Sequence, residues 1–215
     1  MVAPFEHVVT TADQLRALYR APSRTVQRKK TDRMDDATQR FIQASPFLLM
    51  ATSAADGSCD VSPRGGPPGF VRVLDDRRLV IPDLSGNNLL DSLVNLTTNP
   101  HLGLLFLIPG RDETLRVDGG AWITTAPRIL ALWDGELRQP KTAVGVEVEH
   151  AFVHCAKSFR RGRVWDAESW AEVGLAPDAC DLLIAHIGLD AEANDIRASL
   201  EESYRRDLAA DSVQS

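Results

Sequence analysis

The feature that most constrains this chain is a series of short apolar runs, separated by turn residues, between Phe41 and Trp165. Runs of this length, bounded in this way, predict strands joined by tight connections. Asp56-Gly57 and Pro109-Gly110 are dipeptides that favour such turns. The sequence therefore predicts a mostly antiparallel split β-barrel, and the helical patterns on either side make the fold class α+β.

Two polar stretches interrupt these runs, and together they predict a site for a phosphate-bearing ligand. They are residues 62–66, Ser-Pro-Arg-Gly-Gly, and residues 82–88, Pro-Asp-Leu-Ser-Gly-Asn-Asn. Glycine and asparagine let the backbone come close to a ligand, and arginine supplies charge in a planar fork. A helix expected to begin at Ser85 would add free backbone amides, which bind anions at a helix amino terminus.

Composition and charge narrow the class of protein. The 215 residues allow one core with helical additions, and 44% hydrophobic with 25% charged residues is typical of a soluble globular protein. A formal net charge of −6 argues against nonspecific binding to nucleic acid, which needs a broad basic surface. The sequence has no apolar run of eighteen residues, so we expect no association with a membrane.

The cysteines and histidines predict neither disulfides nor a metal site. Cys59, Cys155 and Cys180 are odd in number and form no C-x-x-C pair, so a reducing cytoplasm fits best, and Cys155 is expected to be a buried thiol. His150 and His154 would stand roughly 13 Å apart along one strand, too far to share an ion.

Three segments are expected along the chain. Residues 1–45 form an N-terminal helical segment, with a capping-box pattern at Thr11 and Gln14. Residues 46–165 form the barrel core. Residues 166–215 form a C-terminal helical segment that packs on the same domain, where its last helix would cover a barrel edge, join a partner subunit or remain a solvated amphipathic helix.

Within the core, three patterns predict local structure. The nearly continuous apolar run from Leu102 to Ile108 predicts a strand buried on both faces. Gly119-Gly120 predicts a bulge or a close backbone approach. Residues 144–149 alternate as a strand with one exposed face, which continues to about Cys155.

Several motifs taken together resemble the pyridoxamine 5'-phosphate oxidase-like flavoproteins, and most closely their uncharacterised FMN-dependent branch. The resemblance implies a split barrel that forms a homodimer and binds FMN at the subunit interface. The motifs are Ser45-Pro46-Phe47-Leu48, Ser62-Pro63-Arg64-Gly65, Ile81-Pro82-Asp83, Gly86-Asn87-Asn88, Asn99-Pro100, Leu115-Arg116-Val117-x-Gly119 and His154-Cys155-x-Lys157-Ser158.

The resemblance also implies a set of cofactor-binding residues. Arg64 and Lys157 are the expected charges for the phosphate, since residues 85–88 replace the Ser-Arg-Lys motif of the vitamin-pathway oxidases. This departure argues against pyridoxamine phosphate as the substrate. The ring and the ribityl chain would be lined by Ser62, Gly65, Ile81, Pro82 and Asp83, and the anion site would be completed by Asn87 and Asn88.

Some residues of this set have alternatives that the sequence leaves open. Arg116 would reach the cofactor or pair with a neighbouring carboxylate on the barrel face. Lys157 and Arg160 would hold a phosphate or an anionic tail, and a solvated helix face is the alternative for Arg160. Trp165 would cover the flavin from the second subunit or pack in an interface. Asp83 would accept a hydrogen bond from the ligand or cap a turn.

The resemblance implies an FMN-dependent oxidoreductase acting on a small organic substrate that the sequence does not identify. No catalytic residue is predicted. The alternative is a module of the same fold that binds flavin, deazaflavin F420 or haem without turnover. Among enzymes, F420 ranks below FMN as the cofactor.

Overall fold

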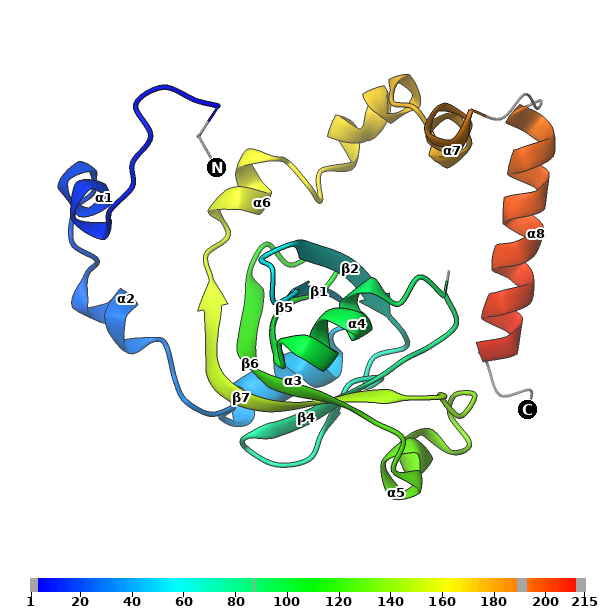
Figure 1. Cartoon of the computed structure of the whole chain (residues 1–215), viewed down its shortest axis with the longest axis horizontal. Helices are drawn as coiled ribbons and strands as arrows, with labels where there is room; N and C mark the ends of the chain where they lie inside the picture. Colours follow the sequence, from blue (N-terminus) through cyan, green and yellow to red (C-terminus); the bar gives the residue numbers. More distant parts are fainter. Residues whose placement is uncertain (1–3, 87, 189–192, 212–215) are drawn as a thin grey trace.

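The computed structural model describes residues 4–86, 88–188 and 193–211. Its centre is a seven-stranded antiparallel sheet in the order β2-β1-β5-β6-β7-β4-β3, which curls into a split barrel (Figure 1). The expected fold class is therefore confirmed. The strands are β1 Phe47–Ser53, β2 Cys59–Gly65, β3 Arg72–Val73, β4 Arg78–Pro82, β5 His101–Leu107, β6 Thr114–Thr124 and β7 Ala143–His154.

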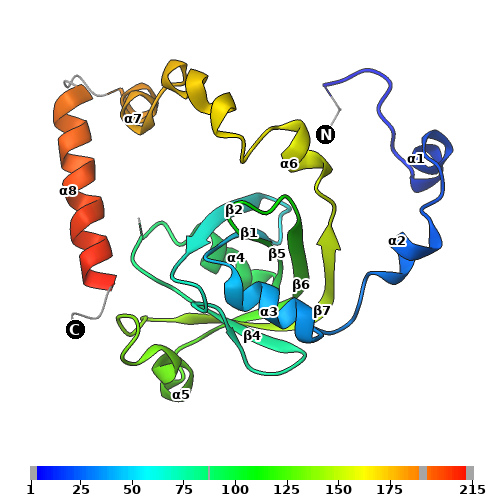
Figure 2. The ribbon, with the colours of Figure 1, turned by 180° about the vertical axis from the view of Figure 1, so that it is seen from behind.

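Helices precede, interrupt and follow the sheet. Figures 1 and 2 show α3 and α4 against the barrel, whereas α1 and α2 on one side and the segment from α6 to α8 on the other extend around it. The helical elements are α1 Ala12–Leu18, α2 Arg24–Arg28, α3 Asp36–Ala44, α4 Asp91–Thr98, α5 Pro127–Leu130, η1 Ala131–Trp133, α6 Lys157–Arg161, η2 Ala167–Leu175, α7 Ala179–Ile187 and α8 Ala193–Asp211. None of those described is long and apolar enough to cross a membrane.

The core fills the barrel and includes Trp133 of η1. This side chain is fully buried, and its Nε1 donates a hydrogen bond of 2.7 Å to the carbonyl oxygen of Phe70. Strand β4 contributes four consecutive buried residues, Leu79 to Pro82.

Strand β5 differs from the expectation of burial on both faces. Leu102, Leu104 and Phe106 point into the core, while the residues between them are partly exposed. The physical reason is that β5 lies between β1 and β6 with only one face toward the core. The apolar residues of its other face remain partly accessible in the single chain.

The glycine pair predicted to form a bulge does so. The register of β6 against β7 shifts between Asp118 and Gly119. A Cβ at Gly119 would stand 2.0 Å from the carbonyl oxygen of Glu147, which real side chains never do. Only glycine therefore allows the two backbones to approach this closely.

Cys155 is exposed, so the expectation of a buried thiol is wrong. It follows the last residue of β7, where the chain leaves the sheet for α6. The alternation that buries every second residue of a strand no longer applies beyond its end.

The terminal segments touch the barrel through a few specific contacts. On the N-terminal side, Thr31 forms an isolated bridge with Ala151 in β7. On the C-terminal side, the indole nitrogen of Trp165 donates to the carbonyl oxygen of Arg111 at 2.7 Å. The end of α8 reaches the loop after β4, where the hydroxyl of Ser85 donates to the Asp211 carboxylate at 2.7 Å.

Candidate functional site

One face of strand β2 carries three polar side chains at alternate positions. Asp60, Ser62 and Arg64 are partly buried, whereas the residues between them are exposed. Side chains alternate across a strand, so these three share a face. Among the described residues, β2 is the first strand of the sheet and pairs along one edge, with β1.

Helix α4 stands over this face and is held there by its own sequence pattern. Leu93 and Leu96 are buried in the core. Asn95 donates through Nδ2 to the hydroxyl of Thr52 in β1 at 3.1 Å. Asn99, at the end of the helix, donates to the carbonyl oxygen of Ser53 at 3.0 Å. These contacts fix the first turn of α4 beside β2.

The loop between β4 and α4 has unusual backbone geometry. Asn88 and Leu90 adopt the left-handed conformation with φ of 58° and 62°, and a bulky residue such as leucine rarely does so. The helix consequently begins at Asp91, not at Ser85 as expected from its apolar spacing. Leu90 provides no side-chain cap for the first backbone amides of α4.

These elements enclose a cavity of about 350 Å³, which is within the range of small-molecule and cofactor sites. Its walls come from β2, the loop after β4 and the first turn of α4. The lining residues are Asp60, Val61, Ser62, Pro63, Arg64, Asp83, Leu84, Gly86, Asn88, Leu89, Leu90, Asp91, Ser92 and Leu93.

Arg64 is the main positive charge in this cavity. Its Nη1 forms an ion pair with the Asp83 carboxylate at 2.9 Å, and both side chains are about one-fifth exposed, at 21% and 19%. Its Nε is buried and has no hydrogen-bond partner among the residues that the structure describes. A buried donor without an acceptor costs free energy, so this atom points to an acceptor on a ligand.

A short chain of hydrogen bonds lies beside Arg64. The hydroxyl of Ser92, a buried residue of α4, donates to the Asp60 carboxylate. The hydroxyls of Ser92 and Ser62 are 2.8 Å apart. Sequence reasoning did not include Asp60 or Ser92 in the site. The alternation Asp60-x-Ser62-x-Arg64 could have indicated the first, but Ser92 depends on where α4 begins.

The structure brings together four of the residues expected to bind the cofactor: Ser62, Arg64, Asp83 and Asn88 line the cavity. Asn87 lies outside the described residues. Gly65 ends β2, opposite Phe47 of β1, and Ile81 and Pro82 are buried in the barrel.

The other four expected residues form a second group elsewhere in the chain. Arg116 pairs through Nε with Asp118 at 2.9 Å on the outer face of β6. Lys157 and Arg160 lie exposed on α6, where Arg160 pairs with Asp112 at 2.8 Å. Trp165 is partly buried and packs against Phe159, with ring centroids 5.7 Å apart. None of the four lines the cavity described above.

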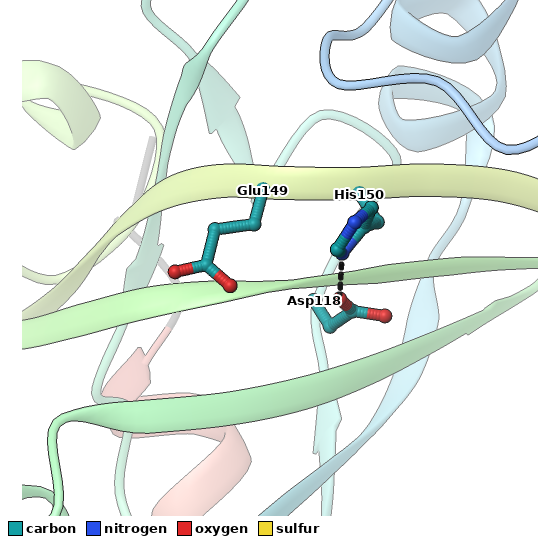
Figure 3. Close-up of side chains that lie close together, drawn as sticks. All are labelled: Asp118, Glu149 and His150. Carbon is teal, nitrogen blue, oxygen red and sulfur yellow. Dashed lines mark hydrogen bonds and ion pairs between the residues drawn. The ribbon is translucent and has the colours of Figure 1, made fainter.

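The bulge in β7 creates one further cluster, on the outer face of the barrel. Gly119 pairs with Val148 and Asp118 with His150, so Glu149 is the extra residue. Glu149 and His150 consequently point to the same side (Figure 3). With Asp118 they bring possible metal ligands within 4.8 Å. The two carboxylate oxygens of Asp118, however, already accept hydrogen bonds from Arg116 and His150.

Histidine 154 lies on the same outer face and has a perturbed pKa. Burial lowers the pKa of this imidazole below its ordinary value, and the positive charges of Lys29 and Arg116 lower it further. Both effects disfavour the protonated ring. At neutral pH this face therefore carries its positive charge on Lys29 and Arg116, which both stand over the ring of Phe152.

Comparison with known proteins gives a clear family and distant structural relatives. Among solved structures, HupZ of Group A Streptococcus is 20% identical, with a TM-score of 0.46 over 55% of this chain and 92% of that one. An FMN-binding protein from Syntrophomonas wolfei is 10% identical, with a TM-score of 0.40 over 54% and 84%. An F420 reductase is 18% identical, with a TM-score of 0.36 over 53% and 93%.

No curated protein matches the chain. The family model for pyridoxamine 5'-phosphate oxidase, in contrast, matches residues 34–155. This match begins two residues before α3 and ends one residue after β7, so it includes the whole sheet and every element that lines the cavity. With its split barrel, the chain belongs to the pyridoxamine 5'-phosphate oxidase family.

Proposed function

We propose that this protein is an FMN-dependent oxidoreductase that works as a homodimer on a small organic substrate. The observation that carries the proposal is the buried Nε of Arg64, which has no partner among the described residues, in a side chain that lines a cavity of about 350 Å³. A phosphate or a ring carbonyl of FMN would supply the missing acceptor.

The residues present fit the cofactor in three respects. Arg64 offers a charged donor, and the uncapped first turn of α4 offers backbone amides to an anion. Asp83, which is held by Arg64 at 2.9 Å, offers an acceptor for a hydroxyl or a ring N–H. When bound, the flavin itself supplies the electron transfer, so the protein needs to hold the ring and leave one face open.

A second copy of the chain would complete the site. Lys157, Arg160 and Trp165 lie at and after α6, on a different part of the barrel from the cavity residues. A twofold dimer can bring two different surfaces of one chain together. The rim of the cavity also exposes apolar side chains that a partner would cover, with Leu89 at 67% and Val61 at 61% exposure.

The alternative of a binding module without turnover is favoured by a specific observation. Two of the carboxylates that line the cavity are already engaged, Asp83 with Arg64 and Asp60 with Ser92. Each of these carboxylates is therefore held by a contact within the protein. A flavin store or sensor would need only the binding contacts.

Spectroscopy of the purified protein tests the proposal. Absorbance and mass spectra identify any bound molecule: FMN absorbs at longer wavelength than F420, and haem shows a Soret band. Anaerobic titration with NADH, NADPH or reduced F420 then tests turnover. Bound FMN that one donor reduces supports the oxidoreductase, and bound FMN that none of them reduces favours the binding module. A protein that binds F420 or haem and no FMN would refute the FMN-dependent oxidoreductase, and a protein that binds none of the three would refute both.

A further inference from the structure

The hydrogen bonds among Asp60, Ser92 and Ser62 have a fixed direction. The Asp60 carboxylate offers only acceptors, so the Ser92 hydroxyl donates to it. A serine hydroxyl has a single hydrogen. In the 2.8 Å contact between the two serines, Ser62 must therefore be the donor and Ser92 the acceptor.

This direction decides what Ser62 can offer to a ligand. Its hydrogen is used by Ser92, so only lone pairs of Ser62 Oγ remain for the cavity that Ser62 lines. We infer that Asp60 and Ser92 act as positioning residues that make Ser62 a hydrogen-bond acceptor, so that Ser62 selects an N–H or O–H group of the ligand and never its phosphate. The inference rests on the proposed FMN site.

The inference also orients the ligand in the cavity. Ser62 and Arg64 are two positions apart on one face of β2, which separates their Cα atoms by about 7 Å. Arg64 Nε is a donor without a partner in the described part of the chain. The cavity thus presents an acceptor and a donor side by side, and a flavin matches them with a ring N–H or ribityl hydroxyl at Ser62 and an acceptor atom at Arg64.

The burial of Ser92 keeps the hydrogen bonds among Asp60, Ser92 and Ser62 in a fixed arrangement. Ser92 is only 2% exposed, so water does not compete for its hydroxyl. It lies in the second position of α4, and the helix is anchored through Leu93 and Asn95. A hydroxyl held in this way stays in one orientation, which keeps the acceptor of Ser62 directed into the cavity.

Equilibrium titration of the apoprotein with FMN and with riboflavin, which lacks the phosphate, tests the inference. The variants are Ser62→Ala, Ser92→Ala and the double variant. We expect each single change to weaken binding about three- to tenfold, by the same factor for both flavins. The double variant should bind no more weakly than Ser62→Ala, because Ser92 acts through Ser62. The matched control is Ser58→Ala, which removes a serine that donates to Asp56 at 2.7 Å on the same hairpin, away from the cavity.

Three results would overturn the inference while the wild-type protein still binds FMN. Ser62→Ala could weaken FMN but not riboflavin, which would place the phosphate at Ser62. The losses from the two serine variants could multiply, which would make the role of Ser92 structural. The variants could also bind normally. If the wild-type protein binds neither flavin, the proposed function fails together with the inference.

A further variant, Asp60→Ala, tests the same inference if Ser92→Ala does not fold. Asp60→Ala changes the other end of the same chain, at a partly exposed position of an edge strand. Removing the carboxylate frees the hydrogen of Ser92, which can then donate to Ser62 and reverse the direction of that bond. The expected loss is again three- to tenfold for both flavins, and it should disappear when Ser62 is already alanine. A loss that persists in the Ser62→Ala background would contradict the inference.

Discussion

Replacing Arg64 by alanine tests the candidate cofactor site most directly. The change removes the donor at Nε and also the ion pair of 2.9 Å with Asp83. A hydrogen bond from a charged group to a ligand contributes about 1.5 to 3 kcal/mol. We therefore expect the Kd for FMN to rise roughly 10- to 150-fold.

The same substitution should affect the stability of the apoprotein much less. Both side chains of the ion pair are about one-fifth exposed, and partly solvated pairs contribute on the order of 1 kcal/mol or less. Thermal denaturation without ligand and fluorescence titration with FMN measure the two effects separately. Arg78→Ala is the control, since Arg78 forms an ion pair with Asp75 on the exposed turn between β3 and β4.

One outcome for the Arg64 variant would refute the role of Arg64 in cofactor binding. If Arg64→Ala is folded and binds FMN within twofold of the wild-type protein, the buried Nε does not face the ligand. Arg64→Lys refines the test because it keeps the charge but lacks the planar fork. We expect an affinity between those of the wild-type and alanine proteins.

Three further predictions concern the barrel and its loops. Gly119→Ala would place a Cβ 2.0 Å from the carbonyl oxygen of Glu147, so we expect a loss of about 3 kcal/mol or more in chemical denaturation; an unchanged midpoint would contradict the bulge. The pKa of His154 is lowered by burial and nearby positive charge, so the unfolded state binds more protons and the free energy of unfolding should fall as pH drops below about 6.5. His154→Gln should reduce this fall between pH 7 and 5, and an identical profile would exclude the histidine as its source. Leu90→Gly should relieve the left-handed strain at φ 62° and raise stability by up to about 1 kcal/mol, whereas a lower melting temperature would show that the leucine side chain matters more than the strain.

Much of the fold was predictable because its signals are local. Asp56-Gly57 gave the β1–β2 turn, and the alternation of residues 144–149 gave the exposed and buried faces of β7. Gly119-Gly120 gave the bulge. Which residues of β5 are buried could not be predicted from the sequence. An apolar residue that is partly exposed to solvent cannot be told from a core residue by its type alone.

The site was predictable where its residues follow one strand, and also at Asp83 and Asn88 in the polar loop after β4. Ser62 and Arg64 share a face of β2, and strand periodicity places both in the cavity. Arg116, Lys157 and Arg160 come from other elements. The family resemblance groups them with Arg64 but does not indicate which copy of the chain supplies each residue. A single chain keeps them apart from the cavity, and in the proposed dimer a second copy would supply them.

The start of α4 shows why the missing part of the site could not be read from the sequence. The apolar spacing from Leu89 to Leu96 fits a helix that begins at Ser85, and helix propensity gives no reason for Leu90 to adopt φ of 62°. That conformation delays the helix until Asp91 and turns its first residues toward β2. Ser92 then meets Ser62 and Asp60 instead of lying in the second turn of a longer helix. Strain at one residue is thus what assembles the hydroxyl chain, and such strain persists only where the surrounding contacts hold it.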